Sequence, residues 1–250
     1  CVPTVDALAL DGDRPLRGHP SYGVARRIRQ EGLSSYLHVY DTQDGRELAC
    51  VPVPGAWVTH VQFSPVNPDW ILYNHEWSGH SGLLRMWLWD GLTHRAIRTE
   101  GNGRSRRDWT CHEVWSHDGD SVLYHGRYQG GRDFIGRIRL QDNETMEIPL
   151  PAGWDWYGHY DAPSPACLIS DGYFRPAGRT TGYHCPWLCR IDVDWEERRM
   201  TWTPLTAHLT SWRSQDAHPH PRADPSGRYV YFNSDRDGRR AVYRVALAPG

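Results

Sequence analysis

The sequence contains no lysine, so all 28 of its basic residues are arginine. This absence excludes the mechanisms that need a lysine amine: a Schiff base, a lysine general base and the lysine of a Walker A phosphate loop. Acidic residues number 30, and the formal net charge of −2 gives no general positive field for binding a nucleic-acid backbone. The polar chemistry is therefore left to 14 His, 13 Trp and 13 Tyr.

Long apolar runs and paired cysteines are also missing. No stretch approaches 18 apolar residues, and the N-terminus lacks the charged, apolar and small-residue segments of a signal peptide. The only close cysteine pair, Cys185 and Cys189, lacks the C-x-x-C spacing of a redox motif. We expect reduced thiols in a cytoplasmic protein without a membrane or nucleic-acid partner. The oligomeric state stays open.

A repeat runs through the sequence. Four segments each begin with His, pass a short turn of Pro, Gly or Asp, and enter an apolar run that is typical of a strand. The offsets of 52, 47 and 61 residues between them are close to the roughly 40–50 residues of a propeller blade. The segments begin at His60, His112, His159 and His220, and their expected strands cover residues 70–73, 121–124 and 228–232.

Further strands are expected between these starts, whereas helical periodicity is weak. The pattern predicts an all-β propeller of four-stranded blades, with about five blades visible, in a single domain over 1–250. The added strands are expected at 83–89 with 93–98, 134–140 with 145–149, 188–193 with 200–204, and 240–246. The blades would cover 56–107, 108–155, 156–210 and 211–250, after a partial blade at 34–55, with 1–33 unassigned or part of a blade.

Residues that begin the inner strand of each blade lie at one mouth of a propeller. We therefore expect His60, His112, His159 and His220 to converge on one rim, at the same mouth. The segment SQDAHPHP adds His218, which points to the same side as His220 if the chain is extended. Together with His159 and the Gln215 oxygen, these side chains form a donor set that favours Mn, Ni, Co or Zn. A histidine-rich surface turn is the alternative interpretation.

The segments HVQFSP…NHE, TCHEVWSHDG, SQDAHPHP and YFNSDRDG resemble the oligogalacturonate (oligogalacturonide) lyases of polysaccharide lyase family 22. The resemblance runs from about residue 56 to the end. It implies a cytoplasmic seven-bladed propeller with a divalent metal, Mn²⁺ before Ni, Co or Zn. Since about five blades fit here, either N-terminal blades lie outside these residues or the ring is smaller. The resemblance implies that His159, Gln215, His218 and His220 bind the metal, that His112 is the base, and that Arg85 contacts the substrate.

The implied reaction is a β-elimination on short, unsaturated oligogalacturonides that yields 5-keto-4-deoxyuronate in pectin degradation. Removal of the C5 proton requires neutralisation of the adjacent carboxylate, which a metal and Arg85 both provide. A neutral imidazole such as His112 accepts a proton at physiological pH, and His60 and His75 are candidate substrate contacts. A serine hydrolase is disfavoured because G-x-S-x-G is absent. A non-catalytic TolB-like or WD-repeat interaction propeller is the alternative.

Overall fold

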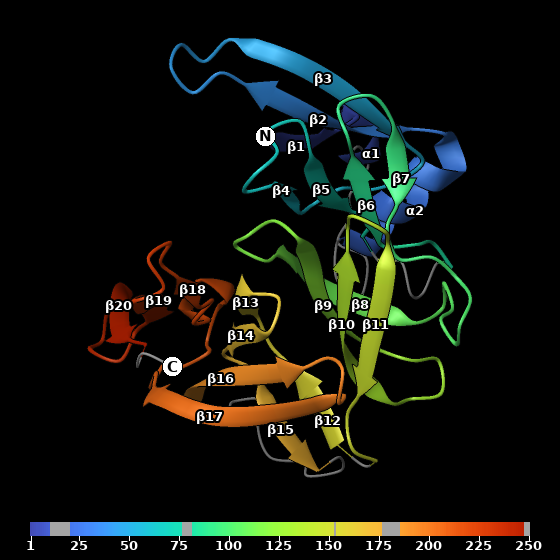
Figure 1. Ribbon diagram of the computed structural model, residues 1–250. Helices are drawn as coiled ribbons and strands as arrows, with labels where there is room; N and C mark the ends of the chain where they lie inside the picture. The colour runs from blue at the N-terminus through green and yellow to red at the C-terminus, as the bar shows by residue number, and fades with distance from the viewer. Residues whose placement is uncertain (11–20, 77–81, 153, 177–185, 248–250) are drawn as a thin grey trace. The chain divides into compact units, whose positions relative to one another are not determined.

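The computed structural model describes residues 1–10, 21–76, 82–152, 154–176 and 186–247 (Figure 1). The chain divides into two compact units, Cys1–Trp109 and Thr110–Gly250, and each is treated by itself below. The division falls beside the expected blade boundary at 107/108. Among the described residues no helix has the length and apolar character needed to cross a membrane.

The first unit contains two antiparallel sheets packed over a shared core. Their facing residues include Leu37, Val53, Ile71 and Tyr73, all 3% exposed or less. The Asp90-Gly91 turn between the last two strands is held by the Asp90 carboxylate, which accepts the Thr93 backbone N–H at 2.7 Å. The sheets comprise β1 (Val2–Val5), β2 (Ser34–Tyr40) and β3 (Glu47–Pro54), then β4 (Val61–Phe63), β5 (Ile71–Asn74), β6 (Met86–Trp89) and β7 (His94–Ala96).

Residues 1–33 hold structure that the strand pattern did not predict. β1 adds a third strand to the expected partial blade, and two helices follow, α1 (Ala7–Leu10) and α2 (Ser21–Glu31). α2 buries Val24 and Ile28 against Ala9 and exposes Arg26 and Arg29. Its apolar stripe is only about two turns long, which is too short a signal to separate a helix from a loop by periodicity.

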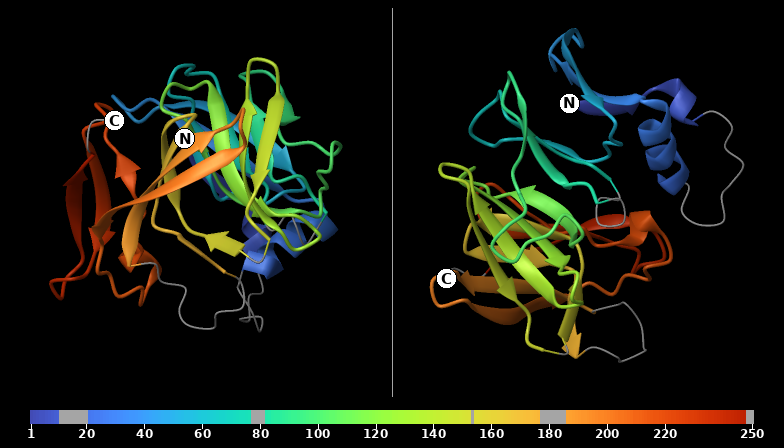
Figure 2. Two further views of the ribbon diagram at one scale, coloured as in Figure 1. Left: turned by 60° about the horizontal axis from the view of Figure 1, so that its bottom comes forward. Right: turned by 90° about the vertical axis from the view of Figure 1, so that its right-hand side faces the viewer.

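The second unit consists of successive antiparallel blades (Figures 1 and 2). Two of them have the four-stranded meander that the repeat predicts, so the all-β propeller class is confirmed. The blades comprise β8 (Trp109–Trp115), β9 (Ser121–Arg127), β10 (Asp133–Arg139) and β11 (Glu144–Pro149); β13 (Tyr160–Ser164), β14 (Cys167–Ser170), β16 (Trp187–Asp194) and β17 (Arg199–Ala207); and β18 (Arg222–Ala223), β19 (Tyr229–Ser234) and β20 (Ala241–Ala246).

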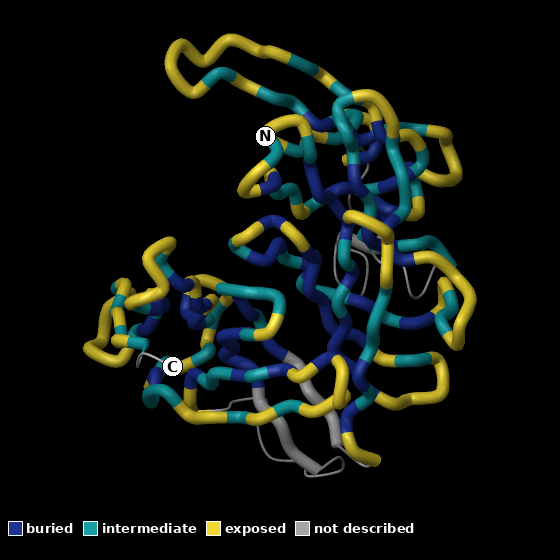
Figure 3. Tube along the Cα trace, in the orientation of Figure 1, coloured by how far each residue is buried: buried dark blue, intermediate teal, exposed yellow. Residues whose placement is uncertain are grey.

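Apolar side chains fill the spaces between neighbouring blades of the second unit. Leu123 and Ile135 of one blade pack with Leu168 and Ile191 of the next, all fully buried. Ile169 and Leu188 in turn pack with residues of the third blade. Figure 3 shows β9, the second strand of its blade, as buried along nearly its whole length, whereas the β2–β3 hairpin tip of the first unit is exposed. The blades are therefore held by burial between sheets.

A two-stranded ribbon continues the middle blade. β12 (Trp154–Tyr157) pairs with β15 (Tyr173–Pro176), and the β13–β14 pairing continues the same register through Tyr160 and Ser170. Between the two pairings, Gly158 lies opposite Gly172, so close that a Cβ atom on Gly158 would stand 2.1 Å from the Gly172 Cα atom. Only glycine fits at this narrow point, which lies next to His159.

Cysteines do not form disulfides among the described residues. Cys1, Cys50 and Cys167 carry free thiols. Cys185, the partner of the one close pair in the sequence, lies outside the described residues. The reduced state of the cysteines stays a prediction.

Candidate active site

Three histidines of the second unit lie together. His159 comes from the junction of β12 and β13, and His218 and His220 come from the segment before β18. Each offers one ring nitrogen, and these atoms lie within 4.8 Å of one another. The His159 and His220 ring centroids are 3.8 Å apart, and those of His159 and His218 are 5.5 Å apart. The structure thus brings together the three imidazoles that the sequence grouped.

The segment that carries His218 and His220 folds as a short turn followed by extended chain. A 3-10 turn, η1 (Gln215–Ala217), ends at His218, whose φ of −68° and ψ of 143° are extended as expected. His220 departs from that expectation, because its φ of 44° lies in the left-handed region. Such a conformation is costly for a residue other than glycine and is typical of functional sites.

Asp171 fixes the histidine group from behind. This carboxylate is fully buried, lies opposite His159 in the ribbon, and contacts the His159 Nδ1 atom at 3.0 Å. It also accepts the backbone N–H groups of His159, at 2.7 Å, and of His220, at 3.0 Å. A carboxylate on the far nitrogen of a histidine is the usual outer partner of a metal ligand. His159 is therefore oriented with its Nε2 atom available.

The electrostatics of the group favour a neutral His220 beside a charged carboxylate. Burial, with a smaller contribution from the neighbouring His159, lowers the pKa of His220 to about 4. For Asp171, burial by itself raises the pKa, but the hydrogen bond from His159 and the two backbone N–H groups outweigh it and lower the pKa overall. Neutral imidazole is the form of histidine that binds a metal ion.

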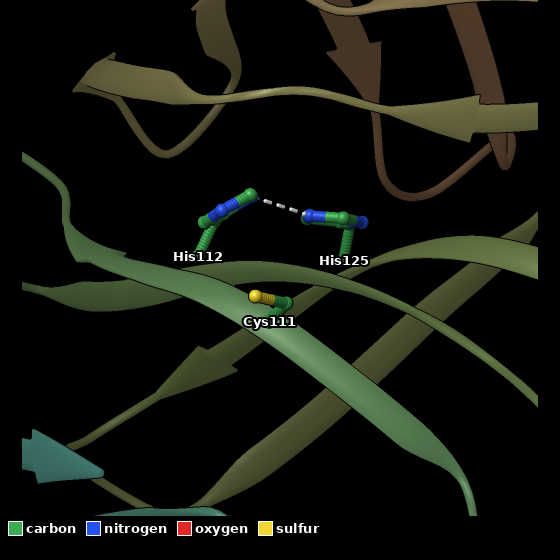
Figure 4. A group of neighbouring side chains, drawn as sticks. All are labelled: Cys111, His112 and His125. Atoms are coloured by element: carbon green, nitrogen blue, oxygen red, sulfur yellow. Dashed lines mark hydrogen bonds between the residues drawn. The ribbon is translucent and has the colours of Figure 1, made fainter. Parts of the chain in front are cut away.

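His112 lies beside this group, on β8. Its ring centroid is 4.7 Å from that of His159, and its Nδ1 atom is 2.9 Å from the Nε2 atom of the fully buried His125 on β9. Figure 4 shows the His112 and His125 rings facing each other with Cys111 beside them. The φ of His112 is 52°, also in the left-handed region. Because successive residues of a regular strand point to opposite faces, this departure allows Cys111 and His112 to share one site.

Gln215, the fourth predicted ligand, is the first residue of η1. Its side chain is exposed, and its backbone oxygen accepts the His218 backbone N–H at 3.1 Å. This contact holds the turn that leads into His218. The role of the Gln215 side chain as a ligand stays a prediction.

Arg85 and His60 belong to the first unit and lie close to each other. Arg85 is buried, its Nη1 atom contacts Glu76 Oε1 at 3.0 Å, and its Nη2 atom lies 3.3 Å from His60 Nδ1. Glu76 also accepts the Thr59 hydroxyl at 2.7 Å and the Asn74 amide at 2.8 Å. The guanidinium is thus held in a polar network, where the sequence alone indicated a solvated or substrate-facing arginine.

His75, the other predicted substrate contact, is buried in the first unit. Its ring stacks on Trp87 with centroids 4.5 Å apart. Burial lowers its pKa to about 3, with a smaller contribution from His94. This environment is that of a packed neutral histidine. A role in substrate contact stays a prediction that the geometry does not favour.

The expected convergence of four histidines therefore holds for His112, His159 and His220 in the second unit, whereas His60 belongs to the first unit. Sequence reasoning missed Asp171 and His125. Asp171 directly follows the second strand of its repeat and His125 lies on the second strand of its own, 12 and 13 residues after the histidine that each supports. In the first unit Asn74, 14 residues after His60, likewise accepts the His60 backbone N–H at 2.9 Å. A polar residue at this offset in every repeat was the available signal.

Comparison with known proteins gives a consistent family resemblance. No family model matches the chain. The oligogalacturonide lyase of Pectobacterium atrosepticum is 26% identical over 203 residues, and the oligogalacturonate lyase of Dickeya dadantii is 24% identical over 203 residues. Each alignment covers 75% of this chain and 49% of the relative. The chain thus spans about half the length of the curated relatives that it matches.

Solved structures agree on the fold. An oligogalacturonate lyase in complex with manganese superposes with a TM-score of 0.67 at 22% identity, covering 98% of this chain and 61% of that one. An oligogalacturonate lyase from Vibrio parahaemolyticus gives a TM-score of 0.67 at 21% identity, covering 99% and 62%. In sequence and fold, the chain is an oligogalacturonate lyase-like protein.

Proposed function

We propose that this chain carries the metal and base centre of a lyase that cleaves short, unsaturated oligogalacturonides by β-elimination, giving 5-keto-4-deoxyuronate. The observation that carries the proposal is the group of His159, His218 and His220, braced by buried Asp171 and adjacent to His112. Similarity to oligogalacturonate lyases supports the substrate class. Pectin breakdown in the cytoplasm is the expected setting.

The histidine group fits a divalent metal ion. Asp171 occupies the Nδ1 side of His159 and leaves Nε2 for coordination, and the low pKa of His220 keeps that ring neutral. His159, His218 and His220, with Gln215 as the proposed fourth ligand, would hold Mn²⁺, or Ni, Co or Zn in its place. A bound divalent ion would neutralise the uronate carboxylate and so acidify the C5 proton.

His112 is proposed to accept the C5 proton. Its Nδ1 atom contacts His125, so proton transfer would take place at Nε2. This assignment requires Nδ1 to carry a proton and donate it to His125 Nε2, which fixes the reactive tautomer. Loss of the C5 proton leaves an electron pair that forms the C4–C5 double bond, and the glycosidic C4–O bond breaks. Buried His125 is thereby a positioning residue for His112.

Arg85 is proposed to contact the substrate carboxylate. Its guanidinium is already paired with Glu76, so it would share its charge between Glu76 and the substrate. His60, 3.3 Å from Arg85, would join it as a substrate contact. Arg85→Lys keeps the positive charge but lacks the planar guanidinium that pairs with a carboxylate through two hydrogen bonds. A higher KM in a variant that still folds would support this role.

The proposal is tested by elemental analysis of the purified chain together with an ultraviolet assay of digalacturonate cleavage. One equivalent of a divalent metal and the appearance of unsaturated or keto products are expected. His218→Ala should remove the stoichiometric metal and the activity. A folded chain without metal that is inert towards digalacturonate would contradict the proposal and would favour a non-catalytic interaction propeller.

A further inference from the structure

A second group of metal-binding side chains lies on the β2–β3 hairpin of the first unit. His38, Glu47 and Cys50 each offer one donor atom, and these atoms lie within 4.8 Å of one another. The His38 Nδ1 atom is 2.8 Å from Glu47 Oε1. His38 is partly buried, and the other two side chains are exposed. This group supplies nitrogen, oxygen and sulfur, whereas the group in the second unit contains no thiol.

The strand pairing explains how the three side chains reach one face. His38 and Cys50 are direct cross-strand partners in the β2–β3 ladder, so their side chains project to the same side. Glu47 is three residues before Cys50 and would point to the opposite side of a regular strand. The register shifts after Val39, however, so that Tyr40 pairs with Glu47 and Leu48 is the extra residue.

This irregularity is a β-bulge, which re-aims a side chain by inserting one residue. Tyr40 is two residues from His38 and lies on the same face, so its partner Glu47 lies on that face as well. The bulge therefore adds a carboxylate to the His38–Cys50 pair. The sheet did not need it for packing, because Leu48, the inserted residue, is exposed.

The other nitrogen of His38 also has a partner of the kind that metal sites use. The Thr4 hydroxyl oxygen, on β1, lies 2.8 Å from His38 Nε2. A histidine that binds a metal through one nitrogen donates its other N–H to an oxygen, which fixes the tautomer and the ring orientation. With the metal at Nδ1, the Nε2–H group would donate to Thr4. The three strands of the sheet thus supply both the ligands and the outer partner.

We propose that His38, Glu47 and Cys50 form a binding site for a zinc-class divalent ion, with Thr4 orienting His38 and the fourth position open to water. The thiolate and the carboxylate together balance the charge of the ion. Binding releases the thiol proton of Cys50, while the His38 proton moves to Nε2. Tetrahedral zinc bonds of about 2.0–2.3 Å place neighbouring donors roughly 3.3–3.7 Å apart, so the exposed side chains need only small movements.

The donor set also separates this site from the histidine group of the second unit. The thiolate of the hairpin group favours a zinc-class ion such as Zn²⁺ or Co²⁺. Co²⁺ is the suitable probe, because a cobalt–thiolate bond gives a charge-transfer band in the near ultraviolet. His159, His218 and His220 lack sulfur and cannot produce that band. Success or failure of this site is therefore independent of the lyase proposal.

The experiment is a titration of the purified, reduced chain with Co²⁺, followed by absorption. We expect a thiolate band that reaches saturation in the wild type, disappears in Cys50→Ser and remains in Cys111→Ser. Cys111 is the matched control because it also lies beside two histidines. A band that is absent from the wild type, or that survives in Cys50→Ser and is lost in Cys111→Ser, would overturn the proposal.

The outer partner gives a second, independent readout. Thr4→Val keeps the shape and the strand propensity but removes the hydroxyl that faces His38. We expect Zn²⁺ affinity, measured by competition with the Co²⁺ band, to fall by roughly tenfold or more. An unchanged affinity in a folded Thr4→Val variant would contradict coordination through Nδ1.

Discussion

Replacing Asp171 by Asn should weaken metal binding as well as the fold, whereas the same change at Asp161 should weaken the fold alone. Asp171 is fully buried and accepts three N–H groups, among them His159 Nδ1–H. An amide nitrogen in place of the Oδ2 atom cannot accept that proton. His159 would then carry its proton on Nε2, the atom proposed to bind the metal, and would cease to be a ligand in that tautomer.

The size of the effect follows from these contacts. Loss of an outer-partner carboxylate costs about 10–100-fold in metal affinity, or roughly 1.4–2.7 kcal/mol. Loss of one charge-assisted hydrogen bond lowers the free energy of unfolding by about 1.5–3 kcal/mol. Calorimetric titration with Mn²⁺ measures the first quantity, and urea unfolding of the metal-free chain measures the second.

Asp161 offers the matched control. It is equally buried and contacts His117 at 2.9 Å, Arg222 at 2.8 Å and the Ala223 backbone N–H at 2.8 Å, but contacts none of the predicted ligands. Asp161→Asn should lose comparable stability and retain its Mn²⁺ affinity. If Asp171→Asn bound Mn²⁺ as the wild type does, or if both variants lost affinity equally, the assigned role of Asp171 would be refuted.

Three further predictions concern the base, the buried histidine and the narrow point of the ribbon. His112→Ala should lower turnover by about 10²–10⁴-fold and keep its metal content unchanged, whereas His159→Ala should lose both turnover and bound metal. Identical behaviour of the two variants would refute the division between base and ligand. The folded pKa of His75, about 3, lies below its unfolded value of 6.5, so the stability that His75 contributes is complete above pH 6.5 and is lost as the pH falls towards 3, by about 2 kcal/mol at pH 5. The free energy of unfolding in urea should therefore differ less between pH 7 and pH 5 in His75→Phe than in the wild type. An equal difference in the two proteins would contradict the assignment. Gly158→Ala should destabilise the chain by about 3 kcal/mol or more because its Cβ atom meets the Gly172 backbone, whereas Gly130→Ala, with open space around it, should leave thermal unfolding nearly unchanged.

The sequence predicted the strands of the repeat well because their signal is local. Turn pairs such as Asp90-Gly91 bound short runs of β-branched and aromatic residues, and the observed β6, β10 and β16 lie within two or three residues of the expected ranges. The grouping of His159, His218 and His220 followed from the repeat together with the SQDAHPHP spacing. Both depend on periodicity, which a single sequence records directly.

Other features depend on contacts between distant residues. The left-handed φ angles of His112 and His220 are uncommon for residues other than glycine and depend on the surrounding contacts. In the sequence, Asp171 stands in a Ser-Asp-Gly segment that is typical of a turn. In the fold, its carboxylate accepts hydrogen bonds from the His159 ring and from the backbone N–H of His220, which lies 49 residues after Asp171. The sequence pattern around Leu48 likewise gives no indication of the bulge. Such contacts appear only once the register between strands is known.

The central claim is that the histidine group and His112 form a metal-dependent lyase centre. The most direct test follows the ultraviolet absorbance of the new C4–C5 double bond while the chelator-treated chain acts on digalacturonate at increasing Mn²⁺ concentrations. We predict activity that is absent without metal, saturates as one equivalent binds to the histidine group, and is lost in His112→Ala although Mn²⁺ still binds. A folded wild-type chain that binds one equivalent of Mn²⁺ through His159, His218 and His220 and leaves digalacturonate intact would contradict the claim.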